Sequence, residues 1–249
     1  MRRFALGLLF PILLLAAWWL VGASSPAAHS VISTPPEVVI AFIGSAVNGT
    51  LWTDVGVSLL RALGGWAAAL VLAAPLGIVM ARVATIRRVL GPVLNVLRPI
   101  SPVAWIPVAI LWFGIGYGSK VFIVGIISFF VILANAFHAA ASIDPLLLKA
   151  VRTFTRSHLR TALYVVLPAS LHGVMNGAQF ALASAWGGVI VAEYTGANSG
   201  VGYEMLHAAN LFLPARVMAS MVTVAIVGYL LNAAFKGAVN TKVVSKYLT

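Results

Sequence analysis

The stretch that decides the fold is Val121-Phe-Ile-Val-Gly-Ile-Ile-Ser-Phe-Phe-Val-Ile-Leu-Ala-Asn-Ala-Phe-His-Ala-Ala-Ala-Ser-Ile143, which contains no Asp, Glu, Lys or Arg. A helix needs about 20 predominantly apolar residues to cross the hydrocarbon core of a bilayer. These 23 residues therefore predict a membrane-spanning helix over about 120–140. Five further stretches of at least 19 residues also lack these four residue types: Phe4–Pro36, Ala62–Ala81, Pro99–Ser119, Thr161–Ala192 and Val217–Phe235.

With one helix in each stretch, the sequence predicts six transmembrane helices, over about 4–22, 63–81, 99–114, 120–140, 171–192 and 216–235. We expect an all-α, polytopic membrane protein in which residues 1–249 form a single transmembrane domain. The uncharged stretch Val38–Thr53 is shorter and contains two glycines and an asparagine, so we expect it at the membrane interface. The N-terminus resembles a secretory signal, but its apolar run of about 18 residues exceeds a signal core, which favours a retained helix.

The composition excludes several classes of protein. Apolar residues make up 61% of the chain and charged residues only 8%, against about 25% charged in a typical soluble domain. Soluble globular and disordered proteins are therefore excluded. The chain contains no Cys, which excludes disulfides, thiolate metal sites and a Cys nucleophile. No metal-ligand spacing is present among the histidines, and we expect neither a metal site nor catalytic residues.

The basic residues are distributed unevenly between the predicted loops. If both termini are cytoplasmic, 13 of the 16 Lys and Arg residues lie inside and only Arg61, Lys120 and Arg216 lie outside. Cytoplasmic loops of membrane proteins carry such an excess of Lys and Arg. Topology thus explains the net charge of +11 without any binding of nucleic acid. We expect a multi-pass protein with both termini in the cytoplasm.

The loop between the predicted fourth and fifth spans, residues 144–168, contains its own helix signals. Asp144 is a favoured N-cap and Pro145 a favoured first helical residue, so we expect a helix from 145. Thr155-Arg156-Ser157 can interrupt this helix, with Ser157 capping a second turn, and Leu167-Pro168 closes the loop. Four basic residues would share one face if the helix persisted: Lys149, Arg152, Arg156 and Arg160. The pattern fits a helix held to anionic membrane lipid, or a docking helix for a cytoplasmic partner.

Two groups of motifs are informative together. The first is Pro102-Val-Ala-Trp-Ile-Pro-Val-Ala-Ile-Leu-Trp-Phe-Gly-Ile-Gly-Tyr-Gly-Ser-Lys120, followed by Ser128-Phe-Phe and Asn135. The second is Val166-Leu-Pro-Ala-Ser170, followed by Ala185-Trp-Gly-Gly-Val-Ile-Val-Ala-Glu193 and Ser199-Gly-Val-Gly-Tyr203. In this order they resemble the permease subunits of bacterial ABC importers, most of all the nitrate/sulfonate/taurine-type group of binding-protein-dependent permeases. The similarity extends over roughly residues 55–235.

The resemblance implies a type I ABC importer permease in the bacterial inner membrane, with three kinds of protein partner. These are a dimer of ABC ATPase subunits, an extracytoplasmic substrate-binding protein and a second permease copy, for which a homodimer is favoured and a heteromer remains open. ATP and Mg would be bound by the ATPase and no cofactor by this chain. The nearest approach to a phosphate-binding loop, Gly114–Lys120, has the wrong spacing.

The resemblance also implies that the loop 144–168 is the coupling element, which fits into a cleft of the ATPase. Aligning the family pattern on Leu167-Pro168 places Lys149 where the family has Glu and Thr155 where it has Gly. Because a β-branched Thr disfavours positive φ, we expect a right-handed or extended turn at Thr155. The residues expected at the ATPase contact are Lys149, Ala150, Val151, Arg152, Phe154, Thr155, Arg156, Leu167 and Pro168.

Polar side chains inside the predicted spans are the candidates for a substrate pathway: Ser128, Asn135, Asn176, Gln179 and Ser184. Such groups either connect neighbouring helices by hydrogen bonds or line a path for a polar solute. Asn176 and Gln179 are three residues apart and would share a face. Glu193 ends the fifth span and is expected to pair with Arg61 or Arg216, because an unpaired acid near a bilayer is costly.

These observations predict the permease subunit of an ATP-driven importer for a sulfonate, nitrate or similar small organic molecule. An ion-coupled transporter that acts without an ATPase is an alternative, but such proteins usually bury a carboxylate near the membrane centre. An intramembrane protease is a further alternative. Ala197-Asn198-Ser199-Gly200 only distantly resembles a nucleophile turn, and Ser199 is predicted to lie in an extracytoplasmic loop.

Overall fold

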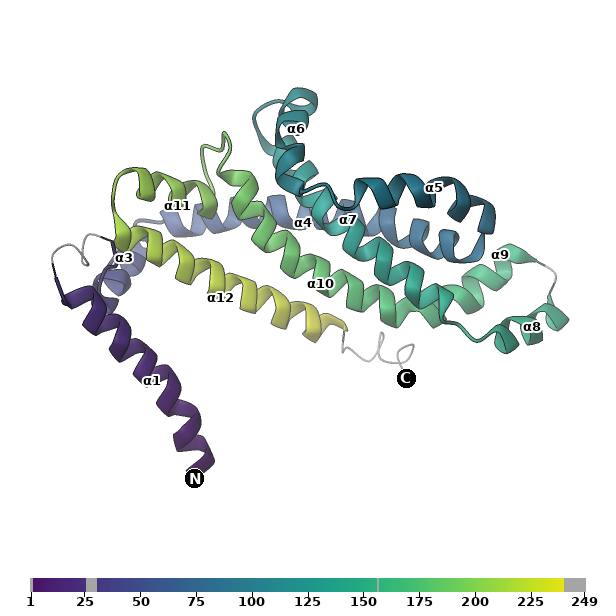
Figure 1. Ribbon diagram of the computed structural model, residues 1–249, viewed down its shortest axis with the longest axis horizontal. Coiled ribbons are helices and arrows are strands. Elements are labelled where there is room, and N and C mark those ends of the chain that lie inside the picture. The colour runs from purple at the N-terminus through teal and green to yellow at the C-terminus, as the bar shows by residue number, and fades with distance from the viewer. Residues whose placement is uncertain (1, 26–30, 156, 240–249) are drawn as a thin grey trace. The chain divides into compact units, whose positions relative to one another are not determined.

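The computed structural model describes residues 2–25, 31–155 and 157–239, which form helices and no strand. The chain divides into two compact units. The first unit comprises Met1–Ser58 and Ala197–Val227, and the second comprises Leu59–Gly196 and Gly228–Thr249. Figure 1 labels the helices, of which α4 (Thr50–Arg82) and α12 (Pro214–Val239) each contribute to both units.

The first unit contains α1 (Arg2–Ala23), α3 (Pro35–Val47) and α11 (Val201–Asn210), together with the beginnings of α4 and α12. Polar contacts to α4 fix the start of α11. The carboxylate of Asp54 accepts a hydrogen bond from the Gly200 N–H at 2.8 Å, and the Ser58 hydroxyl accepts one from the Val201 N–H at 2.9 Å. These two acceptors satisfy backbone donors that the first turn of a helix leaves without an intrahelical partner.

The second unit is built around two long antiparallel helices. Its elements are the remainder of α4, α5 (Ala84–Leu97), η1 (Pro102–Trp105), α6 (Ile106–Phe113), α7 (Tyr117–Ala141), α8 (Pro145–Phe154), α9 (His158–Thr161), η2 (Ala162–Val166), α10 (Leu167–Glu193) and the end of α12. Figure 1 shows α7 and α10 side by side. A Cβ added at Gly173 would lie 2.4 Å from the Ala139 Cβ, and one at Gly177 would lie 2.5 Å from the Asn135 Cβ. Glycine therefore permits the close approach of the two helices.

Four helices of the described residues are long and apolar enough to cross a membrane: α4, α7, the helix Leu159–Glu193 and α12. The pair Ala84–Leu97 and Pro102–Phe113 passes the same test together. With α1, which has 22 residues, the described helices are compatible with the predicted count of about six spans. The all-α membrane fold is confirmed.

The third predicted span, a single helix over 99–114, is confirmed only in part: residues Pro102–Phe113 are helical, but they pass as a membrane span only together with α5. The structure has α5 at Ala84–Leu97, and the chain bends by 95° before Pro102–Phe113. Proline has no N–H, so Pro99 and Pro102 cannot donate the hydrogen bonds that would continue α5, and Ser101 before Pro102 leaves the helical conformation, with φ −56° and ψ 134°. The prolines thus break this span into two short helices.

The fifth span also differs from the prediction, which closed a loop at Leu167-Pro168 and began a helix at 171. One helix instead runs from Leu159 to Glu193. It continues through a π-helical turn, η2, in which the Leu167 N–H donates to the carbonyl of Ala162, five residues earlier. Pro168 cannot donate to the carbonyl four residues before it, and the wider turn accommodates this loss without ending the helix.

Candidate functional site

The α8–α9 segment, residues 145–161, connects the ends of α7 and α10. The Asp144 carboxylate accepts a hydrogen bond from the Leu146 N–H at 2.7 Å, which confirms the predicted helix start at Pro145. Thr155 ends α8 in an extended conformation, with φ −149° and ψ 136°, as expected for a β-branched residue. The Ser157 hydroxyl accepts from the Arg160 N–H at 3.3 Å and so caps α9, as predicted. The two short helices therefore meet at an extended hinge.

Apolar side chains of the α8–α9 segment are exposed. Phe154, Leu146 and Leu159 are 90%, 70% and 69% exposed. Leu148 is half-buried and packs against a small core cluster of Ala140, Ile143 and Val166. One leucine thus anchors the segment, while Phe154, Leu146 and Leu159 remain exposed.

A hollow of ≈ 740 Å³ lies between the segment and the body of the second unit. Its lining includes Val79 and Arg82 at the end of α4 and Leu148, Thr155 and Leu159 of the segment. The guanidinium of Arg82 also donates a hydrogen bond to the Ala140 carbonyl, which fixes the end of α7. The segment is therefore attached to a fixed helix end but is not packed against the core along its length.

Some of the residues predicted for the ATPase contact lie together on α8, and others lie elsewhere. Lys149, Ala150 and Phe154 are exposed on α8, and Val151 and Thr155 are half-buried. Leu167 and Pro168 lie at the start of α10. Arg156 and the side chain of Arg152 lie outside the described part of the chain. The helix is interrupted at the extended Thr155, as the sequence predicted, so Lys149 on α8 and Arg160 on α9 do not share one continuous helix face.

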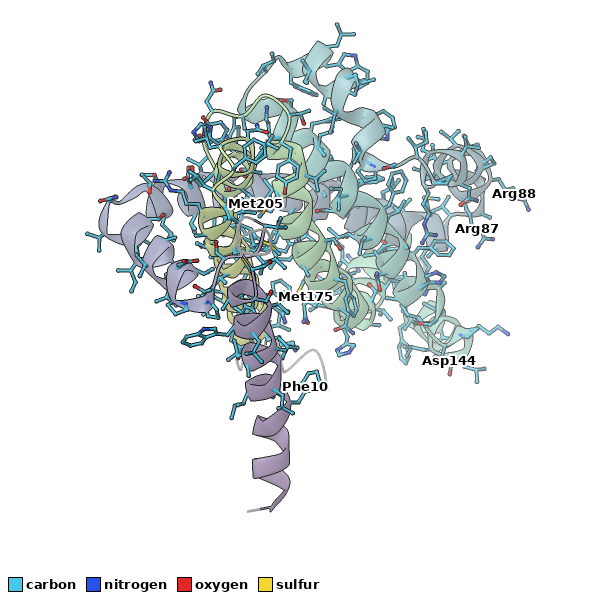
Figure 2. The ribbon with its side chains drawn as sticks, turned by 60° about the vertical axis from the view of Figure 1, so that its left-hand side comes forward. Phe10, Arg87, Arg88, Asp144, Met175 and Met205 are labelled. Atoms are coloured by element: carbon cyan, nitrogen blue, oxygen red, sulfur yellow. The ribbon has the colours of Figure 1, made fainter. Side chains whose placement is uncertain are left out.

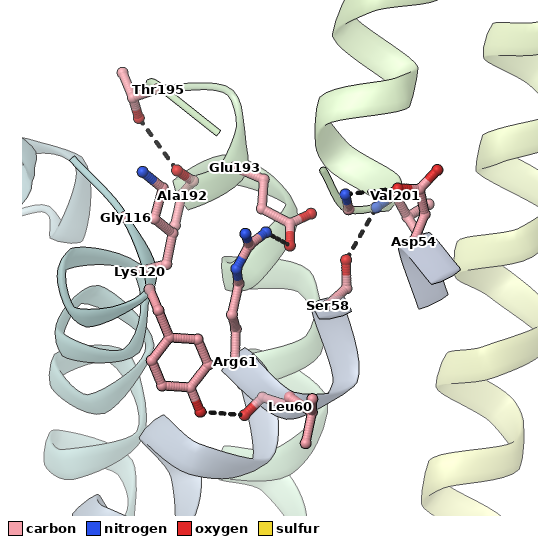
Figure 3. Close-up of polar contacts among 12 residues, drawn as sticks. Asp54, Ser58, Leu60, Arg61, Gly116, Lys120, Ala192, Glu193, Thr195 and Val201 are labelled. Atoms are coloured by element: carbon pink, nitrogen blue, oxygen red, sulfur yellow. Dashed lines mark hydrogen bonds and ion pairs between the residues drawn. The ribbon is translucent and has the colours of Figure 1, made fainter. Parts of the chain in front are cut away.

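At their other ends, α7 and α10 carry a buried charge cluster formed by Arg61, Lys120 and Glu193 (Figure 3). The Arg61 guanidinium donates to the Glu193 carboxylate at 2.7 Å, which confirms the first of the two predicted partners. Lys120 is only 2% exposed and its Nζ donates to the Gly196 carbonyl at 3.1 Å. Because buried charges are costly unless they are paired and hydrogen-bonded, these contacts fix α4, α7 and α10 to one another.

The five candidate pathway residues do not form one cluster. Gln179 donates to the side-chain oxygen of Asn232 on α12 at 2.8 Å, whereas Asn176 is exposed on α10. The two residues of the predicted shared face therefore have different environments. Ser184 is also exposed and donates to the carbonyl of Phe180 in its own helix.

On α7 the remaining two candidates face the protein. Asn135 donates to the Val131 carbonyl at 2.8 Å and packs at Gly177. Ser128 is fully buried, and its hydroxyl has no hydrogen-bond partner among the described residues. Asn135 and Gln179 thus serve helix packing, and Asn176 and Ser184 are the candidates left on an open helix face.

Sequence reasoning missed two polar residues of the second unit. Asn232 was overlooked as the partner of Gln179, although an amide within an apolar span is itself a signal of an interhelical hydrogen bond. Lys120 is predicted to lie at the extracytoplasmic start of the fourth span, and its burial is not predicted, because it depends on the carbonyl of Gly196, which is distant in sequence. No pattern local to Lys120 could have indicated this contact.

The comparisons with known proteins agree with this architecture. Residues 73–240 match the family described as "Binding-protein-dependent transport system inner membrane component". The chain is 30% identical to the putative aliphatic sulfonates transport permease protein SsuC of Bacillus subtilis, over 90% of this chain and 81% of that protein. It is 27% identical to the taurine transport system permease protein TauC of Escherichia coli, over 88% and 82%. For the riboflavin transport system permease protein RibX of Chloroflexus aurantiacus the identity is 31%, over 90% and 84%.

Among solved structures, an inward-facing form of the MetNI methionine ABC transporter matches with a TM-score of 0.67 and 21% identity. The match covers 75% of this chain and 93% of the other. At this level of identity the likeness establishes the fold, which is that of a type I ABC importer permease. With the family match over two thirds of its length, the chain belongs to the inner membrane components of binding-protein-dependent transport systems.

Proposed function

We propose that this chain is the permease subunit of an ATP-driven importer that moves a small solute from an extracytoplasmic binding protein into the cytoplasm. Two copies of the chain would enclose the pathway, and a separate ABC ATPase dimer would hold ATP and Mg²⁺. The excess of basic residues in the predicted cytoplasmic loops supports an orientation with both termini in the cytoplasm.

The observation that carries this proposal is the construction of the α8–α9 segment. It is capped at both helix starts, it presents Phe154 at 90% exposure and it is anchored mainly through Leu148. Large exposed apolar groups on a small ordered element are typical of a protein-binding surface. We therefore infer that the segment docks into the ATPase, with Phe154 as its buried anchor.

The same geometry supports a means of coupling. Because α7 and α10 lead directly into and out of the segment, a pull on α8 would act on two helices of the second unit. The hollow beneath the segment leaves room for α8 to move before it meets the core. Movement of packed helices against one another is a common way to switch access in transporters. Lys149 would face a part of the ATPase surface that is not basic, because like charges would oppose docking.

For the substrate we propose a small organic solute such as a sulfonate. The relatives named above are described as permeases for aliphatic sulfonates, taurine and riboflavin. An ion-coupled mechanism without an ATPase is less well supported, because the buried acid Glu193 is held in an ion pair with Arg61. An intramembrane protease is likewise less well supported, because the chain belongs to a transport family.

The absence of Cys from the chain allows a direct test of the docking site. Single cysteines at Ala150 and Phe154 should form crosslinks to the ATPase in membranes that contain the whole transporter. A cysteine at Phe212, which is 87% exposed and predicted to be extracytoplasmic, is the matched control and should not crosslink. Crosslinking at Phe212 but not at Phe154, or labelling of Ala150 and Phe154 only from outside the cell, would contradict the proposal.

A further inference from the structure

The second unit contains a groove of ≈ 320 Å³ between α5 and α7, which we call the α5–α7 groove. On the α5 side it is lined by Arg87, Gly91, Asn95 and Arg98. These residues are spaced by four, four and three positions, so they form one continuous stripe along the helix. The stripe lies on the first half of the bent pair Ala84–Leu97 and Pro102–Phe113, which together are long and apolar enough to enter a membrane. The pair moves Arg98 from its expected place in a cytoplasmic loop to the bend between the two helices, where an arginine is costly and usually marks a functional site.

The α7 side of the groove supplies two phenyl rings, Phe130 and Phe137, and the imidazole of His138. α5 begins at the end of the unit that carries α8, and α7 runs towards that end (Figure 1). Figure 2 shows Arg87 and Asp144 at this end as well. The antiparallel course places His138 near the Arg87 end of the groove and Phe130 near the Arg98 end. The groove therefore has Arg87 at the end near α8, which we call its mouth, and Arg98 at the opposite end, which we call its inner end. The apolar rings lie between these two arginines.

The charge of the groove is uncompensated by its own helices. Neither α5 (Ala84–Leu97) nor α7 (Tyr117–Ala141) contains an acidic residue. A guanidinium in a groove with low-dielectric walls attracts an anion and offers it a planar pair of N–H donors. A volume of this size falls in the range of small-molecule sites, which are mostly apolar with a few placed polar groups.

We propose that the α5–α7 groove binds the anionic group of a small organic oxyanion, such as a sulfonate, carboxylate or phosphate, with its short apolar part against Phe130 and Phe137. This assignment rests on the proposed function and adds the place in the chain at which the anionic group of the solute is held. Arg87 attracts the anion at the mouth, and Arg98 holds it at the inner end.

A phospholipid headgroup has the same chemistry, and the geometry favours the solute. Arg87 and Arg98 are eleven residues apart, which is about 16 Å along a helix axis. The interfacial layer that contains headgroups is only about 5–8 Å thick on each side of a bilayer. With α5 along the membrane normal, a headgroup at Arg87 does not also reach Arg98, whereas a mobile solute can occupy the inner end.

Two variants and one matched control test the site. Arg98→Ala removes the inner cation. Gly91→Leu fills the groove, because a Cβ at Gly91 meets nothing within 4 Å and leucine is a good helix former. Arg88→Ala removes an equal charge from the next position of α5, on a residue that does not line the groove. Figure 2 labels Arg87 and Arg88 on this helix.

The measurement is isothermal titration of the full chain, in nanodiscs of phosphatidylcholine, with sodium butanesulfonate at constant ionic strength. We expect binding of butanesulfonate but not of butanol. Arg98→Ala and Gly91→Leu should each weaken it at least tenfold, and Arg88→Ala should change it less than twofold. No binding to the wild type, or equal weakening by Arg88→Ala, would overturn the proposal.

A second arm repeats the titration in nanodiscs of phosphatidylglycerol. Unchanged butanesulfonate binding supports a solute site. Loss of binding, together with bound phosphatidylglycerol that Arg98→Ala releases, would make the groove a lipid site and overturn the proposal.

The crosslinking test at Phe154 distinguishes a failure of the groove proposal from a failure of the proposed function. Crosslinking without sulfonate binding would overturn the groove alone, whereas sulfonate binding without crosslinking would support the groove and contradict the ATPase partner.

Discussion

The two ends of the α7–α10 pair are built in opposite ways. At one end Arg61, Lys120 and Glu193 form the charge cluster, in which each residue is at most 7% exposed and takes part in a hydrogen bond. At the other end the α8–α9 segment exposes Phe154 almost completely and lies over a hollow. The two helices are thus held together by buried charges at one end, and at the other end they are joined by a loosely packed, exposed segment, although Arg82 holds the end of α7 itself. This difference indicates that a force applied to the α8–α9 segment is transmitted to helices that are held together.

The largest effect should follow from breaking the charge cluster. Glu193→Ala leaves the Arg61 guanidinium buried beside no carboxylate, and removing one partner of a buried pair costs about 3–5 kcal/mol. We expect a loss of this order in thermal or denaturant unfolding of the purified permease. The double variant Arg61→Met/Glu193→Leu is the control and should recover part of the stability, since the Arg61 guanidinium is no longer left without its carboxylate while Lys120 keeps its hydrogen bond to the Gly196 carbonyl. A loss below about 1 kcal/mol for Glu193→Ala would show that the cluster does not hold the helices together.

A smaller loss is expected from the contact between α7 and α10. Gly177→Ala places a methyl group 2.5 Å from the Asn135 Cβ, and such overpacking costs about 1–3 kcal/mol. Gly187→Ala is the matched control on the same helix, because its Cβ meets nothing within 4 Å. This control should be neutral or stabilising by up to about 1 kcal/mol, since alanine is the better helix former. Equal destabilisation by both variants would contradict the close packing.

The smallest effect concerns the amide pair between α10 and α12. A double-mutant cycle with Gln179→Leu and Asn232→Leu should give a coupling energy of about 0.6 kcal/mol, the average for interhelical hydrogen bonds in a membrane. The same cycle with Asn176→Leu and Asn232→Leu should give none, because Asn176 is exposed on α10. Coupling of Asn232 to Asn176 rather than to Gln179 would mean that α10 has a different rotation about its axis.

The features that could be predicted from the sequence are those that depend on residues close together in the chain or on the cost of a buried charge. The start of α8 at Pro145, the cap at Ser157 and the extended Thr155 each follow from the chemistry of one or two residues. The pairing of Arg61 with Glu193 follows from the cost of a buried acid, which leaves few possible partners.

The features that could not be predicted depend on the length of a helix or on contacts between residues that are far apart in the sequence. α5 has only 14 residues and contains Arg87 and Arg88, so no window of about 20 apolar residues reveals it. Pro168 predicted a helix end, but a π-helical turn accommodates it, and that choice depends on the packing of the whole helix. The α5–α7 groove could not be predicted either, because it is lined by α5, the half of the third span that the sequence did not reveal.

The central claim is that the α8–α9 segment, which joins α7 and α10, couples to the ATPase through Phe154. It is tested most directly by the ATPase activity of the assembled transporter, stimulated by the loaded binding protein, in the Phe154→Ala variant. Removing an aromatic anchor of an interface costs about 2 kcal/mol or more, so we expect at least a tenfold loss of stimulation with unchanged unfolding of the permease. Phe212→Ala, at a residue of similar exposure, should keep the stimulation of the wild type. Full stimulation in Phe154→Ala would contradict the account.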